Sequence, residues 1–240
     1  MQSFFTRNTE LPMQNSNHII CTSMPRSGHH LLVRLLTGYY QNNFFYCDYY
    51  GVHNKSCCKK IPCINYQDKL KLDSVFMQKS HDHALKDPVL DDYKYFIQYR
   101  HPIPRSISNF QLYIKKDSEN RNTKEGFKKF LDIEHNYYIK FYEKWLRDAK
   151  NNILLLKYED LSTSSLESIQ KVVKFINNNK SFDSNKWSNA QKELEYRSKK
   201  KDKYQQNDIS EFRFYDQDLL KEFEDKIFYH CPNLEYESYF

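Results

Sequence analysis

Four short segments of this chain are almost continuously apolar, and they constrain the fold more than any other feature of the sequence. They are rich in aliphatic and aromatic side chains and cover residues 18–23, 74–80, 95–100 and 152–158. Strands that are buried on both faces have such a composition, whereas strands with one solvated face alternate apolar and polar residues. We therefore expect four parallel strands inside one sheet.

Segments with helical periodicity lie between and after these strands. Apolar side chains recur every three or four residues over 28–40, over 124–150 and around Leu219–Phe228, which is typical of amphipathic helices. A further helix is expected after Ser164, because Ser164 and Glu167 have the spacing of a capping box. The alternation of strands and helices predicts an α/β fold with a central parallel sheet flanked by helices.

The rest of the chain shows neither the apolar segments of buried strands nor the periodicity of amphipathic helices. We interpret residues 1–17 as an N-terminal extension, and residues 41–73 and 177–213 as irregular loop regions. No low-complexity linker divides the chain into two halves. We therefore expect residues 1–240 to form a single domain, since this length suffices for one sizeable core.

Glycine is scarce, and its scarcity excludes two large classes of nucleotide-binding protein. The chain contains Gly28, Gly38, Gly51 and Gly126 and no other glycine. Neither the GxxxxGK[ST] loop of Walker-type ATPases nor the GxGxxG loop of dinucleotide-binding dehydrogenases can be drawn from them. No stretch approaches about 18 uninterrupted apolar residues, which predicts no membrane span. Residues 1–17 lack the apolar region of a secretory signal, so the expected location is the cytoplasm.

The charge balance is mildly basic. The chain has 37 basic and 31 acidic residues, a net charge of +6, which favours an anionic partner. A nucleic-acid-binding protein more often concentrates its charge in one patch. We interpret the densest basic run, Lys199–Lys203 next to Arg197, as a solvated loop. We therefore expect no nucleic-acid partner.

Four of the six cysteines, Cys47, Cys57, Cys58 and Cys63, lie close together in the sequence. Zinc sites normally show a C-x₂₋₄-C pair on each side of the metal. Cys58 and Cys63 offer one such pair, the chain has no second pair, and adjacent cysteines suit a single tetrahedral ion poorly. We expect a structural or lightly oxidised cluster and no metal.

The first predicted strand is followed by the motif P-R-S-G-H-H over residues 25–30, and then by a helix. Amide groups at the start of a helix have no intrahelical partners and carry the positive end of its dipole, so they favour an anion. Arg26 adds a guanidinium suited to phosphate or sulfate oxygens, and Ser27 adds a hydroxyl. We predict that this loop binds an anion, although an ordinary strand-to-helix turn around Gly28 is the alternative.

Polar residues also follow the second and third strands. Ligands of α/β sheets bind beyond the carboxyl ends of the strands, so these residues are candidates for a site. Lys79 and His81 end the second strand, and because side chains alternate along a strand, both point to the same side. His81 taken alone is more often a surface or packing residue than a functional one. Arg100 ends the third strand, and Ser108 lies on the expected following helix.

The fourth strand is followed by the motif Y-E-D-L, which begins at Tyr158. Carboxylates at such a position most often cap a helix or form hydrogen bonds within the loop. We favour that structural role for Glu159 and Asp160.

The order of these motifs resembles the PAPS-dependent sulfotransferase family. The chain shows P-R-S-G after the first strand, K-S-H after the second, an Arg followed eight residues later by a Ser from the third, and Y-E-D-L after the fourth. In that family the P-[KR]-S-G loop holds the 5′-phosphosulfate of 3′-phosphoadenosine-5′-phosphosulfate (PAPS). Across about residues 18–161, the resemblance implies a P-loop-like sulfotransferase fold, PAPS as the sulfuryl donor and a strand–loop–helix phosphosulfate-binding motif.

The resemblance also implies roles for individual residues. It places the loop around the 5′-phosphosulfate, the Arg–Ser pair at the 3′-phosphate, and the tyrosine of the fourth motif near the adenine. It places the lysine and the histidine of the second motif at the reacting centre. The residues implied for the donor are Arg26, Ser27, Gly28, His29, His30, Arg100, Ser108 and Tyr158, and those implied for catalysis are His81, Lys79 and Arg26.

The chain departs from the family pattern in three places. His29, His30 and Leu31 stand where the family often has T-T-W, whose Trp stacks on the adenine. No glycine follows Gly126, so the late R-K-G motif is absent, which leaves open which C-terminal basic residues complete the 3′-phosphate site. Residues 31–40 contain no carboxylate that could act as the base, which favours His81 in that role.

The resemblance implies in-line transfer of a sulfuryl group to an acceptor hydroxyl, with no need for a metal. Between residues 47 and 66, Lys55, Lys59 and Lys60 outnumber the single carboxylate of Asp48. This surplus favours an anionic glycan over a small alcohol or phenol, which remains an alternative. Two further alternatives are a different nucleotide-dependent phosphotransferase and a non-catalytic module that binds an anion or RNA. The oligomeric state is not predicted.

Overall fold

A five-stranded parallel sheet forms the centre of the protein, here described from a computed structural model. The structure describes residues 17–50, 57–65, 74–116, 121–178, 181–198 and 208–240. The strand order is β2-β3-β1-β4-β5, and every pair is parallel. The strands are β1 (His18–Ser23), β2 (Phe44–Cys47), β3 (Val75–Ser80), β4 (Lys94–Tyr99) and β5 (Ile153–Lys157). Four of them confirm the strands predicted from the apolar segments.

The strand β2 corrects the prediction that residues 41–73 are irregular throughout. A short 3₁₀ helix, η1 (Gln41–Asn43), leads directly from the first helix into this strand. Phe44 pairs with Val75 and Cys47 with Gln78, so β2 lies at the edge of the sheet beside β3. Four residues are too few to show a period-two pattern. The strand is formed because β3 offers it a partner.

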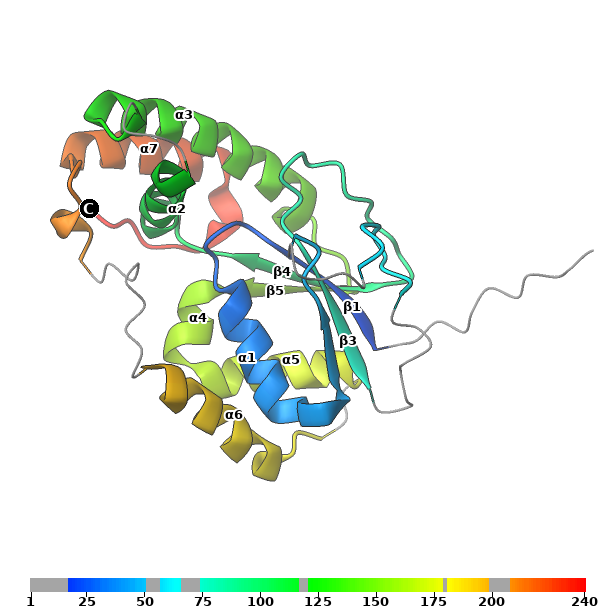
Figure 1. The fold of residues 1–240 in the computed structure, drawn as a ribbon. Helices are drawn as coiled ribbons and strands as arrows, with labels where there is room; N and C mark the ends of the chain where they lie inside the picture. The colour runs from blue at the N-terminus through cyan, green and yellow to red at the C-terminus, as the bar shows by residue number, and fades with distance from the viewer. Residues whose placement is uncertain (1–16, 51–56, 66–73, 117–120, 179–180, 199–207) are drawn as a thin grey trace, which may run out of the picture.

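Helices cover both faces of the sheet, as predicted (Figure 1). One layer contains α1, α4, α5 and α6, and the other contains α2, α3 and α7. The predicted helix over 124–150 ends earlier, with α3 at Phe141 and a π-helical turn over Tyr142–Leu146. The bounds are α1 (His29–Tyr40), α2 (Pro102–Lys116), α3 (Lys124–Phe141), α4 (Tyr158–Thr163), α5 (Ser165–Ile176), α6 (Ser184–Ser198) and α7 (Gln217–His230), with short 3₁₀ turns at Ile209–Glu211 and Pro232–Leu234.

The helix α6 corrects the prediction that residues 177–213 are irregular. It packs along α1, where a side chain at Gly38 would place its Cβ only 2.6 Å from the Cα of Ala190. The helix has a weak apolar face because most of its residues are polar, so its sequence carried little periodic signal. Its position depends on the close approach that Gly38 allows.

The predicted capping box at Ser164 does not form. The Ser164 side chain makes no capping hydrogen bond, although the residue does precede α5. Its amide donates to the carbonyl oxygen of Asp160 at 2.8 Å, because Ser164 also ends α4. With ψ at 52°, the backbone is not in the extended conformation that a capping serine adopts.

The two faces of the sheet pack into two separate cores. On β1, Ile20 belongs to the core shared with α2, α3 and α7, whereas its neighbours Ile19 and Cys21 belong to the core shared with α1 and α5. This alternation explains why the consecutive residues Ile19, Ile20 and Cys21 are all apolar. Among the described residues, no helix is long and apolar enough to cross a membrane.

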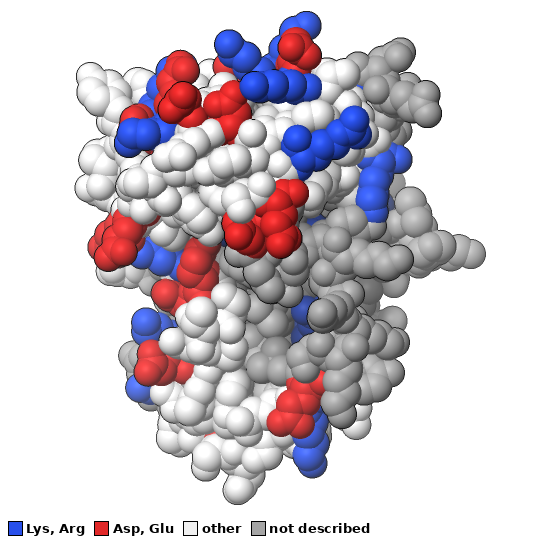
Figure 2. All heavy atoms as spheres, turned by 90° about the vertical axis from the view of Figure 1, so that its left-hand side faces the viewer, with Lys and Arg blue, Asp and Glu red and all other residues white. Residues whose placement is uncertain are grey.

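Basic and acidic side chains are interspersed on the face of the molecule drawn in Figure 2. This distribution among the described residues fits the near balance of 37 basic and 31 acidic residues. The basic run Lys199–Lys203 lies outside the described residues, so its interpretation as a solvated loop stays a prediction.

Candidate active site

The loop after β1 turns sharply into α1 at the carboxyl edge of the sheet. Its amide at Met24 donates to the carbonyl oxygen of Gln98 on β4 at 2.9 Å, and the amide of Ser27 donates to that of Met24 at 3.2 Å. Arg26 and Gly28 both have positive φ, 69° and 84°. The loop is therefore tied to the neighbouring strand and tightly curved before the helix begins.

Gly28 is required at this turn for two reasons. Its φ of 84° lies in the left-handed region that glycine adopts at no steric cost. A Cβ at this position would lie 2.5 Å from the Cδ2 of Tyr158, at the start of α4. The ring of Tyr158 therefore lies directly against the loop.

Ser27 provides the clearest sign that the loop accommodates a ligand. Its side chain is fully buried, and its Oγ has no hydrogen-bond partner among the described residues. A buried hydroxyl without a partner loses free energy, so such a group usually meets a ligand or water. It lies where the first amides of α1 lack intrahelical partners, which is an arrangement suited to an anion.

Arg26, Ser108 and Arg100 converge beside this loop. The Nε of Arg26 donates to the Oγ of Ser108 on α2 at 2.8 Å. The Nη1 of Arg100 donates to the carbonyl oxygen of Arg26 at 3.3 Å, while its Nε is buried without a partner among the described residues. Burial lowers the pKa of Arg100. The guanidinium nevertheless stays charged, because the ordinary pKa of this group is very high. Two cationic groups thus face the same region.

Tyr158 connects the loop to Arg100. The guanidinium carbon of Arg100 lies 4.3 Å from the centre of the Tyr158 ring, which is the geometry of a cation–π contact. The ring therefore lies between Gly28 and Arg100. The structure thus brings together five residues that the resemblance assigned to different parts of one donor, which are Arg26, Gly28, Arg100, Ser108 and Tyr158.

The two histidines of the loop differ in their surroundings. His29 is 5% exposed and faces the sheet, where its Nε2 lies 3.0 Å from the hydroxyl of Tyr46 and its Nδ1 3.3 Å from the Oγ of Ser23. Burial, with the nearby charge of Lys79, holds its pKa well below the ordinary value. His30 is exposed. The His29 ring thus has partners within the protein.

Lys79 reaches the same end of the sheet from β3. It is 7% exposed, and its Nζ lies 3.2 Å from an Oδ1 of Asp48, the residue that follows β2. A buried ammonium without a partner would be costly, and Asp48 provides the partner. Because Asp48 directly follows β2, a strand that the sequence analysis missed, this ion pair could not be predicted from the motif.

His81 lies at the centre of the site, against the end of β1. Its Nδ1 lies 2.7 Å from the carbonyl oxygen of Ser23 and 3.1 Å from the Oγ of the same residue. A carbonyl oxygen only accepts hydrogen bonds, so Nδ1 carries the proton and Nε2 is the nitrogen that can accept one. Burial lowers the pKa of His81 to about 3, and the ring is therefore neutral at physiological pH.

Two tyrosines hold the His81 backbone and ring. The hydroxyl of Tyr50 accepts a hydrogen bond from the His81 amide at 3.1 Å, and the two rings stack with centroids 5.2 Å apart. The hydroxyl of Tyr137 on α3 donates to the His81 carbonyl oxygen at 2.8 Å. His83 lies on the exposed side of this group, with its ring centroid 5.2 Å from that of His81.

Asp82, next to His81, anchors the turn after β3. Its side chain is buried, and its Oδ2 accepts from Lys144 Nζ at 2.6 Å and from Trp145 Nε1 at 2.9 Å. Its Oδ1 accepts from the amide of Asp87 at 2.9 Å. Sequence reasoning missed this residue, because the side chains that bind its carboxylate, Lys144 and Trp145, lie more than sixty positions away and no local motif marks them.

The carboxylate of Glu159 has the structural role that the sequence favoured. It accepts from the amide of His101 at 3.1 Å and from the hydroxyl of Tyr236 at 2.9 Å. It thereby joins the ends of β4 and β5 to the C-terminal segment. The backbone carbonyl of Asp160 accepts from the amide of Ser164 at the end of α4, and a structural role of the Asp160 carboxylate stays a prediction.

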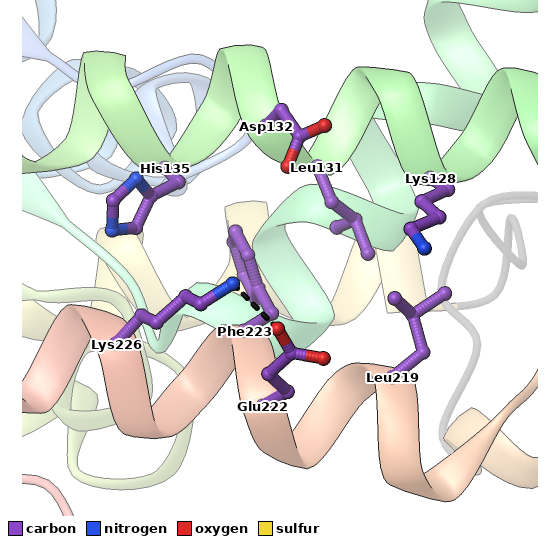
Figure 3. A pocket seen from close by; sticks show the side chains of 8 residues that line it. All are labelled: Lys128, Leu131, Asp132, His135, Leu219, Glu222, Phe223 and Lys226. Atoms are coloured by element: carbon purple, nitrogen blue, oxygen red, sulfur yellow. Dashed lines mark hydrogen bonds and ion pairs between the residues drawn. The ribbon is translucent and has the colours of Figure 1, made fainter.

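A cavity of about 170 Å³ lies between α3 and α7, away from the residues described above (Figure 3). Lys226 crosses its wall and forms an ion pair of 2.6 Å with Glu222 one helical turn earlier. None of the predicted site residues lines this cavity. The candidate site is instead the group of side chains at the carboxyl ends of β1, β3, β4 and β5.

Comparisons with known proteins show the family of the chain and structures with a similar fold. A family model described as "Sulfotransferase domain" matches residues 16–228. No curated protein sequence matches the chain. Among solved structures, the mouse sulfotransferase SULT7A1 complexed with PAP is similar, with a TM-score of 0.64 at 14% identity, covering 91% of this chain and 85% of that one.

Two other solved structures share the fold. Retinol dehydratase in complex with androsterone and the inactive cofactor PAP has a TM-score of 0.57 at 17% identity, covering 93% of this chain and 83% of that one. The sulfotransferase domain of the Synechococcus PCC 7002 olefin synthase has a TM-score of 0.51 at 14% identity, covering 92% and 94%. At such identities the likeness concerns the fold.

Proposed function

This chain belongs to the sulfotransferase domain family, and from that premise we propose that it transfers a sulfuryl group from PAPS to an acceptor hydroxyl. The products are the sulfated acceptor and adenosine 3′,5′-bisphosphate (PAP). The similar mouse sulfotransferase and retinol dehydratase are both complexed with PAP, which supports PAPS as the donor. Location in the cytoplasm stays a prediction from the sequence.

One observation carries this proposal: the buried Oγ of Ser27, which has no hydrogen-bond partner in the described part of the chain, lies in a loop that contains Arg26 and is contacted by Arg100. The donor has two anionic groups, and this chain offers two neighbouring places for them. The loop and the start of α1 suit the 5′-phosphosulfate, because helix-start amides bind anions. Arg100 and Ser108 suit the 3′-phosphate, because guanidinium and hydroxyl groups bind phosphate oxygens.

The proposed reaction needs one base and several positive charges. The acceptor oxygen attacks the sulfur atom while the bond from sulfur to the bridging oxygen of the donor breaks. The acceptor proton moves to Nε2 of His81, the ring nitrogen that carries no hydrogen. Arg26 and Lys79 stabilise the charge that develops on the bridging oxygen and on the departing phosphate.

The protein environment prepares His81 for this role. Its Nδ1 is held by the carbonyl oxygen of Ser23, which selects the tautomer with a free Nε2. Tyr50 and Tyr137 hold its backbone on both sides. A base that is already oriented avoids the cost of being ordered during the reaction.

We further propose that the acceptor is an anionic carbohydrate bound along the segment between β2 and β3. Tyr50 stacks on His81, so this segment begins beside the proposed base. Lys59 and Lys60 are exposed in the same segment, and Lys55 and Tyr66 lie outside the described residues. The positive charge and the aromatic rings suit an acidic sugar better than a neutral phenol.

The donor assignment is tested by calorimetry and by transfer of labelled sulfate. We expect PAP to bind at least tenfold more tightly than AMP or ATP, because AMP lacks the group that Arg100 would bind. Labelled sulfate from PAPS should then appear on at least one member of a panel of glycans, alcohols and phenols. Equal affinity for PAP and AMP would overturn the assignment, and magnesium-dependent turnover of ATP would favour a phosphotransferase.

A further inference from the structure

Four thiols that the proposed transfer does not use gather beside the end of β2. The Sγ atoms of Cys47, Cys57 and Cys63 all lie within 4.8 Å of one another. The Sγ of Cys58 lies 3.6 Å from that of Cys63. Sulfur atoms around one tetrahedral zinc ion lie about 3.8 Å apart, given Zn–S bonds of about 2.3 Å. The thiols are therefore already spaced almost as zinc ligands are.

A backbone amide also points at one of these sulfur atoms. The amide of Lys59 donates to the Sγ of Cys57 at 3.3 Å. A hydrogen bond of this kind favours the thiolate, which is the form that binds metal.

The segment that carries these cysteines is irregular. Residues 57–65 contain no helix or strand, and the buried cluster beneath them consists of Cys47, Cys63 and Phe76. The side chain of Gln78 adds two hydrogen bonds of 2.7 Å, one from the amide of Cys63 and one to the carbonyl oxygen of Lys60. Small units without an apolar core of their own are commonly stabilised by a metal or by disulfides.

We propose that the thiolates of Cys47, Cys57 and Cys63 bind one zinc ion, with the thiol of Cys58 next to its fourth coordination position. Zinc has no redox chemistry and accepts soft sulfur ligands in tetrahedral geometry, and each ligand releases its proton to solvent. The positive charges of Lys59 and Lys60 offset the negative charge of a zinc–thiolate centre.

This inference does not depend on the proposed sulfuryl transfer. It departs from our expectation of a cluster without metal. That expectation was based on pairs of cysteines that lie close together in the sequence. Cys47 comes from β2 and meets the other two only in the folded chain. The ion would fix residues 57–65 against β2 and β3, next to Asp48 and its ion pair with Lys79.

Metal content of the purified full-length protein tests the proposal. The chain is kept reduced, incubated with zinc sulfate, separated from free metal by gel filtration and analysed by mass spectrometry for zinc. We expect about one zinc per chain. Cys47→Ser and Cys63→Ser should each retain at least tenfold less zinc. Cys231→Ser, which changes a buried cysteine of the core with α7, should retain the full amount.

A spectroscopic arm keeps the test decisive if a cysteine variant does not fold. The wild-type apoprotein is titrated with Co²⁺, and intense thiolate-to-cobalt absorption that excess Zn²⁺ abolishes would support the site. Wild-type protein that retains no zinc and shows no such absorption would overturn it. An intact mass that reveals a disulfide among these cysteines in the protein as purified would also overturn it.

Discussion

The Nε of Arg26 donates a hydrogen bond of 2.8 Å to the Oγ of Ser108, although 82 positions separate the two residues in the chain. Arg26 belongs to the loop after β1, and Ser108 belongs to α2, which follows β4. Arg100 donates to the carbonyl oxygen of Arg26, so all three residues form one connected unit. The two proposed phosphate subsites are therefore neighbours.

Replacing Arg100 should affect the proposed 3′-phosphate site selectively. We expect Arg100→Ala to weaken PAP binding by about 10- to 100-fold, because hydrogen bonds to charged groups contribute roughly 1.5–3 kcal/mol. AMP, which lacks that phosphate, should bind the variant and the wild type almost equally. Calorimetry with both nucleotides measures the difference. Arg147→Ala, which removes an exposed arginine after α3, is the control and should change neither affinity. If Arg100→Ala weakens AMP and PAP equally, the residue does not bind the 3′-phosphate.

Replacing His81 should remove the proposed base while leaving the donor site intact. We expect His81→Ala to lower kcat by about 100-fold or more, with the dissociation constant for PAP changed by less than about threefold. The matched control is His83→Ala, since the His83 side chain is exposed and lies beyond the end of β3. A larger loss of kcat in His83→Ala than in His81→Ala would mean that His83 is the base.

The pH dependence of kcat/KM should reflect the low pKa of His81. Burial lowers this pKa to about 3, so the neutral, proton-accepting form persists from high pH down to about pH 3. Between pH 5 and 8, kcat/KM should therefore not fall toward low pH through protonation of this group. A fall in kcat/KM with a midpoint near pH 6.5 that disappears in the His81→Gln variant would contradict the prediction.

A side chain at Gly28 should disturb both the loop and Tyr158. We expect Gly28→Ala to cost about 1 kcal/mol from its positive φ alone, and more because the new Cβ would lie 2.5 Å from the Tyr158 ring. PAP binding should weaken by at least about tenfold. Urea unfolding and calorimetry measure the two effects. The double variant Gly28→Ala/Tyr158→Ala should lose less free energy of unfolding than the two single variants lose in sum, because the ring that meets the new Cβ is gone. If the losses of the two single variants simply add, the Tyr158 ring is not what obstructs a side chain at position 28.

The proposed acceptor segment predicts a split between the two Michaelis constants. Changing Lys55, Lys59 and Lys60 together to Ser should raise KM for an acidic glycan at least about threefold and leave KM for PAPS unchanged, because the charges lie outside the donor loop. Initial rates with each substrate varied in turn measure both constants. Lys171→Ser on α5 is a surface control. An unchanged acceptor KM in the triple variant would remove this segment from the acceptor site.

Much of the sheet could be predicted because its information is local. The strands β1, β3 and β4 are buried at nearly every position, and β5 at the edge of the sheet is a run of one isoleucine and three leucines. Such short apolar segments can be recognised without knowing their partners. The order of polar residues after these strands predicted which side chains meet, since parallel strands end at one edge of the sheet. Arg26, Arg100 and Ser108 do meet there.

Other elements could not be predicted because their information is not local. The strand β2 is four residues long and is formed by pairing with β3. The helix α6 has a weak apolar face and depends on the close approach to α1 at Gly38. The expected capping box failed because α4 runs directly into Ser164 and determines its backbone conformation.

The sequence by itself determined the alternation of strands and helices, the glycine-containing loop after β1 and the set of polar residues at the strand ends. These features depend on side-chain periodicity and on backbone preferences of single residues, which act over a few positions. Only the tertiary structure decided the protonation and orientation of His81, the pairing of Lys79 with Asp48 and the gathering of the thiols around Cys63. Each of these depends on burial and on a partner from another part of the chain. Burial and contacts between distant residues do not exist before the chain has folded, so their effects on charge and hydrogen bonding arise only in the folded protein.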